Sequence, residues 1–184
     1  VRHPGNQLND LFLTYDAVVD NGPAVSAVQR ENGTTSYSYS EAGGVRTVVA
    51  TRGAVSATYK INLGSERGRE RLISKVDRTG QEWKFAYDSF GRLTSKTYPE
   101  GNWDEYRYDD RGNLKETIAY PKPGSSLAPI STKAFFPATC TNAIICNKPT
   151  SLVDGKGSVT DYTYDSSHGG VLTITRPAAS PGAT

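Results

Sequence analysis

Four consecutive residues near the C-terminal end carry the letters of a nucleophilic triad: Asp165, Ser166, Ser167 and His168. A catalytic triad brings its nucleophile, base and carboxylate together from separate elements, with the serine presented on a strained elbow. Four adjacent residues after a strand do not readily reach that geometry, whereas Asp and Ser at such a place commonly cap a turn. The sequence therefore favours a turn here, and we predict no catalytic residue and no enzyme.

Oxygen ligands for calcium are the second candidate chemistry. Asp109 and Asp110 are followed closely by Asn113, and Asp154 precedes a glycine. Calcium loops need several carboxylates at short, fixed spacing, and this chain never shows three. The segment 155–157 has one lysine between two glycines but lacks the spacing of a phosphate-binding loop, so it is interpreted as a hairpin tip. We predict no metal site and no cofactor.

The chain has two cysteines, Cys140 and Cys146. Two cysteines close together in an otherwise cysteine-free chain favour a local disulfide in an oxidising compartment. A metal site would need further ligands, and His3 and His168 are far away in sequence. Thiol redox chemistry usually has a shorter cysteine spacing at the start of a helix. A disulfide is the prediction, with these two alternatives left open.

The strongest pattern in the chain is a repeat. Tyr87 and Tyr108 are 21 residues apart, and so are Gly91 and Gly112. A fixed period of this size is typical of repeat architectures, in which each unit stacks on its neighbours to bury a face.

Aromatic residues alternate with polar residues inside each copy. Trp83, Phe85 and Tyr87 share one parity, and the next copy repeats the alternation. A period of two indicates an extended strand with one apolar and one wet face. We therefore expect the aromatic residues to form one buried face repeated along a sheet. Trp103 is out of phase with the tyrosines of its copy and is the aromatic residue expected to be exposed.

The Tyr-Asp pair ends each strand and opens a turn. The carboxylates of Asp88 and Asp109 can accept hydrogen bonds from backbone N–H groups two residues ahead. A glycine four residues after the tyrosine can adopt the left-handed conformation that such a turn needs, and the next strand begins at once. The repeat positions for which we expect a structural role are Tyr39, Gly43, Tyr87, Asp88, Gly91, Leu93, Tyr108, Asp109, Gly112, Leu114, Tyr164 and Asp165.

Composition and organisation bound the remaining possibilities. With 184 residues and 36% hydrophobic residues the chain can form one sizeable folded body, and a net charge of +2 gives no indication of a nucleic-acid partner or of membrane insertion. The absent start methionine suggests a fragment of a longer chain. The predicted organisation is 1–29, irregular leading strands with a turn at Asn21–Pro23; 30–120, a repeat β-meander; 121–149, a Pro- and Ser-rich loop holding the cysteines and a short strand at 133–136; and 150–184, a further repeat.

These motifs resemble the YD-repeat, or Rhs (rearrangement hotspot), family of bacterial proteins. The match rests on residues 87–94, on residues 108–114 and on the looser turn at Tyr164-Asp165. The resemblance implies an all-β fold of tandem antiparallel hairpins in a curved, twisted sheet, part of a spiral β-shell. It also implies a large secreted or cell-surface polypeptide that surrounds a cargo, commonly a toxin. The self-cleaving segment of the family contains Asp-Pro, which this chain lacks, so that activity is not carried over.

The function expected from the sequence is therefore structural: a segment of a shell that encapsulates or displays a toxin or other polypeptide. Its direct partners are expected to be the neighbouring repeats of the same longer chain. The alternative is a surface adhesin or recognition module that binds glycan or protein through loop 121–149 and exposed aromatic residues. Unpaired terminal strands also lead us to expect that an isolated segment self-associates.

Overall fold

The computed structural model describes residues 12–15, 17–19, 22–30, 33–64 and 70–177. These residues form sixteen β-strands. The described residues contain no helix that is long and apolar enough to cross a membrane. The predicted all-β fold class is confirmed.

The strands are short and are joined mostly by tight turns. Their bounds are β1 Phe12–Thr14, β2 Ala17–Val19, β3 Gly22–Ala24, β4 Ala27–Arg30, β5 Gly33–Ala42, β6 Val45–Arg52, β7 Val55–Asn62, β8 Arg71–Val76, β9 Glu82–Tyr87, β10 Leu93–Thr97, β11 Trp103–Tyr108, β12 Leu114–Tyr120, β13 Ile130–Phe135, β14 Ser151–Val153, β15 Val159–Tyr164 and β16 Val171–Thr175.

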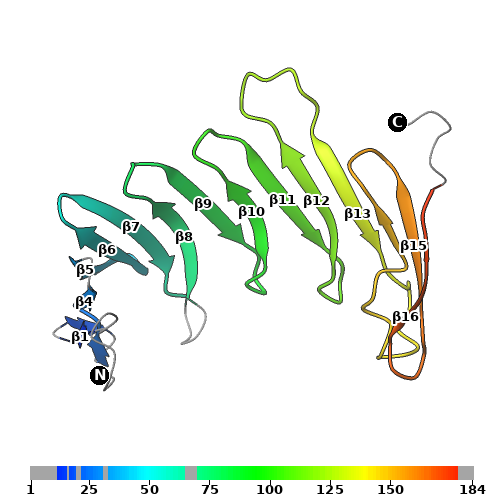
Figure 1. The fold of residues 1–184 in the computed structure, drawn as a ribbon, viewed down its shortest axis with the longest axis horizontal. Helices are drawn as coiled ribbons and strands as arrows, with labels where there is room; N and C mark the ends of the chain where they lie inside the picture. Colours follow the sequence, from blue (N-terminus) through cyan, green and yellow to red (C-terminus); the bar gives the residue numbers. More distant parts are fainter. Residues whose placement is uncertain (1–11, 16, 20–21, 31–32, 65–69, 178–184) are drawn as a thin grey trace. The chain divides into compact units, whose positions relative to one another are not determined.

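Fourteen of the described strands form one open, antiparallel sheet. Its order is β1-β4-β5-β6-β7-β8-β9-β10-β11-β12-β13-β14-β15-β16, while β2 and β3 form a separate two-stranded sheet. From β4 onward each strand is therefore followed in the sheet by the next strand of the chain (Figure 1). Short turns impose this order, because a connection of a few residues can join only antiparallel neighbours. The tandem hairpins expected from the sequence are confirmed.

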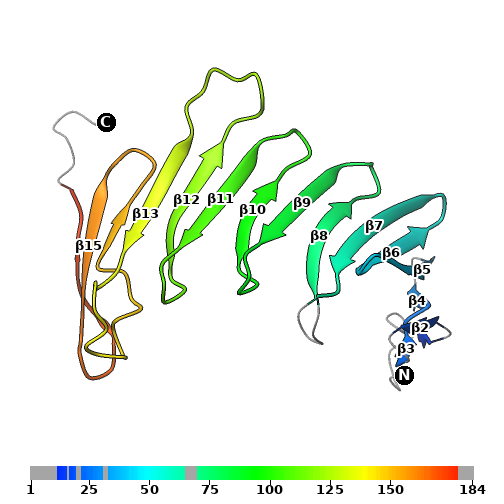
Figure 2. The ribbon, with the colours of Figure 1, turned by 180° about the vertical axis from the view of Figure 1, so that it is seen from behind.

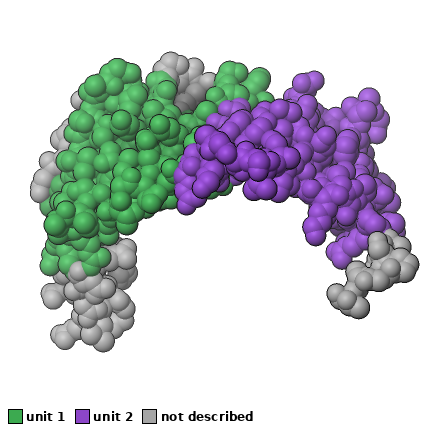
Figure 3. Space-filling view, turned by 90° about the horizontal axis from the view of Figure 1, so that it is seen from above, with its two compact units in different colours: residues 1–93, 97–99 green, residues 94–96, 100–184 purple. Residues whose placement is uncertain are grey.

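The chain divides into two compact units, coloured separately in Figure 3. Unit 1 contains residues 1–93 and 97–99, and unit 2 contains residues 94–96 and 100–184. Strands β6–β9 of unit 1 and β11–β16 of unit 2 are single layers, since Figures 1 and 2 show them from opposite sides with no second sheet on either face.

The aromatic face is half-buried, which corrects the expectation of a buried one. Phe85 and Tyr87 in unit 1, like Tyr106, Tyr162 and Tyr164 in unit 2, keep intermediate exposure. The buried apolar residues of the described part of the chain are Ala50, Ala57, Ile118 and Cys146. The reason is architectural: a sheet buries one face fully only when a second layer packs on it, and here the rings are shielded mainly by their neighbours in the same layer.

The leading segment differs locally from the prediction. Gly22 and Pro23 belong to β3, where they pair with Val19 and Val18 of β2, rather than to a turn; Asn21 lies outside the described residues. Pro23 is tolerated because a two-stranded ribbon leaves the outer side of each strand unpaired, so the missing N–H is not needed.

The segment 121–149 contains more regular structure than composition alone indicates. Strand β13 begins at Ile130, three residues before the predicted strand at 133–136. It pairs with β12 on one side, where Ile118 is opposite Ser131, and with β14 on the other, where Ala134 is opposite Leu152. The cysteine pair lies in the connection from β13 to β14.

Candidate functional site

The hairpin turns are the places where the repeat residues come together. In five of them an aspartate Oδ1 accepts a backbone N–H from two residues ahead and another from three or four residues ahead, at 2.7–3.2 Å. These aspartates are Asp77, Asp88, Asp109, Asp154 and Asp165. One carboxylate thus satisfies two N–H groups that the tight turn removes from the sheet.

Two of these turns lie at the hairpin ends opposite to the Tyr-Asp turns: Asp77 in the β8–β9 connection and Asp154 in the β14–β15 connection. The hairpin tip predicted at 155–157 is confirmed, whereas the turn at Asp77 was missed because no turn was assigned to that aspartate from the sequence. The spacing Asp-x-x-Gly, shared with the turns at Asp88 and Asp109, is the sequence signal that identifies them.

Three of the motif tyrosines use their hydroxyl group to fasten their hairpin to an earlier segment of the chain. The hydroxyl donates a hydrogen bond of 2.7–3.0 Å to a backbone carbonyl 14 or 15 residues upstream. The pairs are Tyr39 with Val25, Tyr87 with Leu72, and Tyr164 with Pro149. Burial raises the pKa of all three phenols, so they remain neutral donors.

Loss of one such hydroxyl should be measurable. We expect Tyr164→Phe to lower the free energy of unfolding by about 1 kcal/mol, because the ring keeps its packing while the carbonyl of Pro149 loses its donor at 2.8 Å. Tyr162→Phe on the same strand is the matched control, because its hydroxyl makes no hydrogen bond within the described chain. Urea unfolding of both variants tests this, and equal losses in the two would contradict the role of the Tyr164 hydroxyl.

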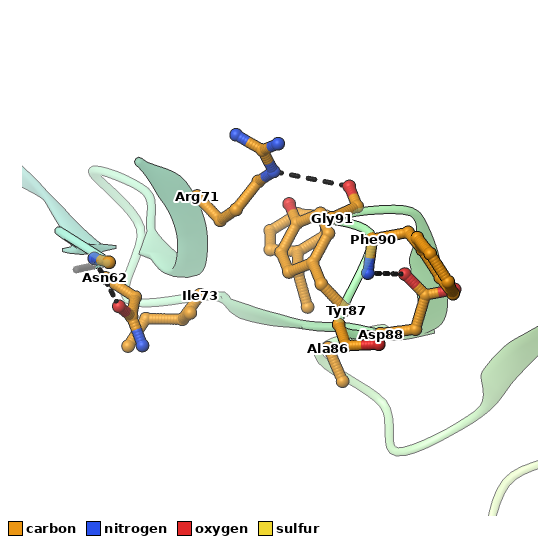
Figure 4. A pocket seen from close by; sticks show the side chains of 11 residues that line it. Asn62, Arg71, Ile73, Ala86, Tyr87, Asp88, Phe90 and Gly91 are labelled. Carbon is orange, nitrogen blue, oxygen red and sulfur yellow. Dashed lines mark hydrogen bonds between the residues drawn. The ribbon is translucent and has the colours of Figure 1, made fainter. Parts of the chain in front are cut away.

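The turn at Asp88 borders an open pocket of about 490 Å³ in unit 1 (Figure 4). Arg71 Nε donates to the carbonyl of Gly91 at 3.2 Å. Phe90 at the turn tip is 81% exposed, and the guanidinium of Arg92 lies 5.0 Å from its ring centroid. The carboxylate of Asp88 is engaged by the backbone N–H groups of Phe90 and Arg92 and by Arg92 Nε at 2.7 Å. The two charged residues that line the pocket, Arg71 and Asp88, are thus engaged in holding the turn.

The turn carboxylates are held in their charged form. Burial by itself would raise the pKa of Asp88, but the hydrogen bonds from Arg92 and Phe90 outweigh it and lower that pKa. The pKa of Asp109 is lowered in the same way, against burial, by the side-chain and backbone hydrogen bonds of Asn113. Backbone N–H groups lower the pKa of Asp154, and the hydroxyl of Ser167 is the main cause of the lowered pKa of Asp165.

These lowered pKa values predict acid sensitivity. The unfolded pKa of an Asp carboxyl group is about 3.9. When the folded pKa lies below this value, the group contributes stability that is complete above the unfolded pKa and is lost as pH falls through the folded pKa. We expect the melting temperature to be nearly constant from about pH 7 to pH 5 and to fall below about pH 4. Asp88→Asn should reduce the size of that fall. Calorimetry at stepped pH is the measurement, and a constant melting temperature down to about pH 2 would contradict it.

The Asp165 turn does not assemble a triad. Ser167 Oγ lies 2.6 Å from Asp165 Oδ1 and donates to it, while His168 Nδ1 accepts the N–H of Gly170 at 3.1 Å. The serine hydroxyl is therefore bonded to the carboxylate and not to the imidazole that would have to activate it. Within the described residues no group of three or more His, Cys, Asp or Glu side chains is placed to hold a metal ion.

The connection between β13 and β14 is closed by a disulfide between Cys140 and Cys146. The guanidinium of Arg111, from the Asp109 turn, donates to three carbonyls of this connection. These are the carbonyls of Pro137 at 2.6 Å, Ala138 at 3.3 Å and Cys146 at 3.4 Å. One arginine thus holds the disulfide loop against the turn that precedes it in unit 2.

The same loop also contacts the turn that follows it. Asn142 Nδ2 donates to the carbonyl of Ser166 at 2.8 Å, and Tyr164 donates to Pro149 at the end of the loop. The disulfide loop therefore lies between the Asp109 and Asp165 turns and takes the place that a Tyr-Asp turn has in the neighbouring β11–β12 and β15–β16 hairpins. This bridging is not visible in the sequence, because its contacts join residues 15 to 35 positions apart.

Trp103 is not an isolated exposed ring, which corrects the expectation from its parity. It is half-buried and stacks on Tyr120, with ring centroids 3.9 Å apart and planes 6° from parallel. On the same face Arg107 bonds Glu105 at 2.6 Å and Glu116 at 3.0 Å, and the Tyr120 hydroxyl donates to Glu105. This face of unit 2, opposite to that of Tyr106 by strand alternation, carries a connected polar network.

The fold and its turns define a class: a β-repeat protein built from tandem hairpins, whose Tyr-Asp corners satisfy their own polar groups and fasten one hairpin to another. Residues 68–102, which include the Asp88 turn and its pocket, match the family model described as RHS Repeat. This match confirms the resemblance to RHS-repeat (YD-repeat) proteins that was seen in the sequence. No curated protein matches it in sequence.

Proposed function

We propose that this chain is a structural segment of a larger Rhs-type protein, secreted or displayed on the bacterial surface, and that it forms part of a β-wall which encloses or displays another polypeptide. RHS-repeat proteins are generally secreted or cell-surface proteins, which supports this location. The role is non-enzymatic: the Tyr-Asp corners use their carboxylates and hydroxyls to satisfy and fasten the backbone.

The half-buried aromatic face is the observation that carries this proposal. In unit 2 it presents Tyr106, Tyr162 and Tyr164, and no second layer of the described residues of unit 2 packs on it. Covering apolar surface contributes about 25 cal/mol per Å². A polypeptide lying on this face would therefore gain free energy, and the wall would gain the second layer that it lacks.

The exposed edge strand of the sheet supports the proposal that the β-wall continues into further repeats. Within the described residues strand β16 pairs with β15 on one side only, and Val171, Leu172 and Ile174 are 53%, 63% and 52% exposed. It has none of the charged residues or prolines that commonly protect an edge strand. Neighbouring repeats of a longer chain would cover this edge.

The same edge predicts self-association of the 184-residue chain by itself. We expect sedimentation velocity to show concentration-dependent dimers or larger species, because β16 can pair with a second strand. Ile174→Lys should shift the chain toward monomer. Ile144→Lys is the matched control, since Ile144 is 46% exposed but lies in the disulfide loop. A strict monomer at high concentration would contradict the prediction.

Site-specific photocrosslinking in the full-length protein tests the wall. A benzophenone amino acid at Thr132 would report on the aromatic face of β13, and the same group at Lys133 would report on the opposite face. We expect crosslinks from Thr132 to polypeptide outside the repeat region and few from Lys133. Absence of crosslinks from Thr132, together with free access of a thiol reagent to Thr132→Cys, would overturn the proposal.

The second candidate function is a recognition module. It is favoured by two exposed apolar side chains in connections, Phe90 at 81% and Leu127 at 73% exposure. Replacing both by serine should abolish binding of the secreted protein to cells or glycans if this candidate is correct, and should leave the Thr132 crosslinks unchanged if the wall is correct.

A further inference from the structure

The aromatic face of unit 2 is interrupted at β13. Strands β11 and β15 each present two tyrosines on this face, Tyr106 and Tyr108 on one and Tyr162 and Tyr164 on the other. In the sheet order, β13 is two strands away from β11 and two strands away from β15. Its side chains on this face are Thr132 and Ala134 rather than tyrosines.

An open trough of about 380 Å³ lies at this interruption. The register places Thr132 opposite Thr117 of β12, and Ala134 opposite Leu152 of β14. Leu152 is in turn opposite Thr160 of β15. The side chains on this face that line the trough are Leu114, Thr117, Thr132, Ala134, Leu152, Thr160 and Tyr162. Threonine and alanine make up most of this lining, and Leu114, Leu152 and Tyr162 are its larger side chains.

One charge beside the trough is unused. Lys115 is the extra residue at the β11–β12 bulge; it lines the trough, is exposed, and has no ion pair within the described chain. The other charged residues near the trough are engaged: Glu116 and Lys133, whose side chains lie on the opposite face by strand alternation, pair with each other at 3.6 Å, and Asp154 caps its turn. The site therefore combines a ring-sized apolar gap with one uncompensated ammonium group.

We propose that this trough binds one aromatic side chain, flanked by an acidic residue, from the polypeptide that covers the face. The inference rests on the proposed function and names the chemistry of the covering segment. An aromatic ring would continue the row of tyrosines across Ala134 and meet Tyr162 in the offset or edge-to-face geometry that aromatic pairs prefer. An adjacent carboxylate would pair with Lys115, which gives the site its preference for acidic segments.

The proposal can be tested on the 184-residue chain with a labelled peptide of sequence Ser-Gly-Phe-Asp-Gly-Ser, by fluorescence anisotropy. Ala134→Phe fills the trough with the repeat's own kind of side chain and should weaken binding by about tenfold or more. Ala119→Phe is the matched control, because Ala119 is exposed on the same face but does not line the trough; its effect should stay within about twofold. Lys115→Gln should weaken binding about threefold and reduce its salt dependence.

The outcomes separate this inference from the proposed function. Unchanged binding to Ala134→Phe, equal binding of a peptide with Leu in place of Phe, or no binding of the peptide at all would overturn the trough. If sedimentation shows that Ala134→Phe dissociates a dimer of the chain, the occupant is a second copy and the proposal is also overturned. In each of these cases, crosslinks from Thr132 in the full-length protein would still support the proposed β-wall. If those crosslinks are absent but peptide binding depends on Ala134, the β-wall is overturned and the trough is supported.

Discussion

Replacing Gly91 by alanine is expected to lower the free energy of unfolding by about 2–3 kcal/mol. Gly91 has a φ of +79°, and a side chain in the left-handed region costs about 1–2 kcal/mol. A Cβ at this position would also collide with the guanidinium of Arg71. The arginine would have to move, and its hydrogen bond to the Gly91 carbonyl, worth about 1 kcal/mol, would be lost.

Gly157→Ala is the matched control for this prediction. Gly157 closes the Asp154 turn with a φ of +85°, yet a Cβ there has no atom within 4 Å. Its replacement should cost only the backbone strain, about 1–2 kcal/mol. Urea unfolding of the two variants compares the losses. Equal losses would show that the Arg71 contact contributes nothing to the Asp88 turn.

Removing the disulfide is expected to cost about 2 kcal/mol in the free energy of unfolding. The bond closes a short loop, with a sequence separation of 6, and a cross-link of this length restricts the unfolded chain only moderately. Cys146 is 3% exposed, so serine there would also bury a hydroxyl. Chemical unfolding with and without a dithiol reductant measures the loss of the cross-link without that substitution.

The structure also predicts where the loosening appears. The loop contacts the Asp165 turn through Asn142, so amides of that turn should exchange with deuterium faster after reduction. Amides of the Asp77 turn in unit 1 serve as the internal control, because the Asp77 turn closes on itself through Thr79 and Gln81. Uniformly faster exchange in both turns would indicate global destabilisation and contradict a local fastening role. Arg111→Lys should accelerate exchange in the disulfide loop even in the oxidised protein, since lysine cannot reach three carbonyls at once.

Most strands and turns follow from local sequence alone. A period-two pattern such as that of β9 specifies an extended strand whatever lies around it. The Asp-x-x-Gly turn is equally local, because the Asp88 carboxylate and its N–H partners at Phe90 and Arg92 are at most four residues apart. Short turns then force each strand to pair with the next, so the antiparallel order followed without any knowledge of distant contacts.

Features that depend on strand register and on the packing of layers do not follow from local sequence. The acceptor of the Tyr87 hydroxyl, 15 residues upstream, follows from how two hairpins are aligned, and nothing near Tyr87 in the sequence specifies it. Trp103 meets Tyr120 because the β11–β12 register makes them partners, so parity alone could not show that it is stacked. The aromatic face is half-buried because no second layer covers it, and the trough at Ala134 exists because Thr117, Leu152 and Thr160 from three other strands surround it. Local pattern fixes which face of a strand is apolar, but the packing of separate strands and layers decides how far that face is buried.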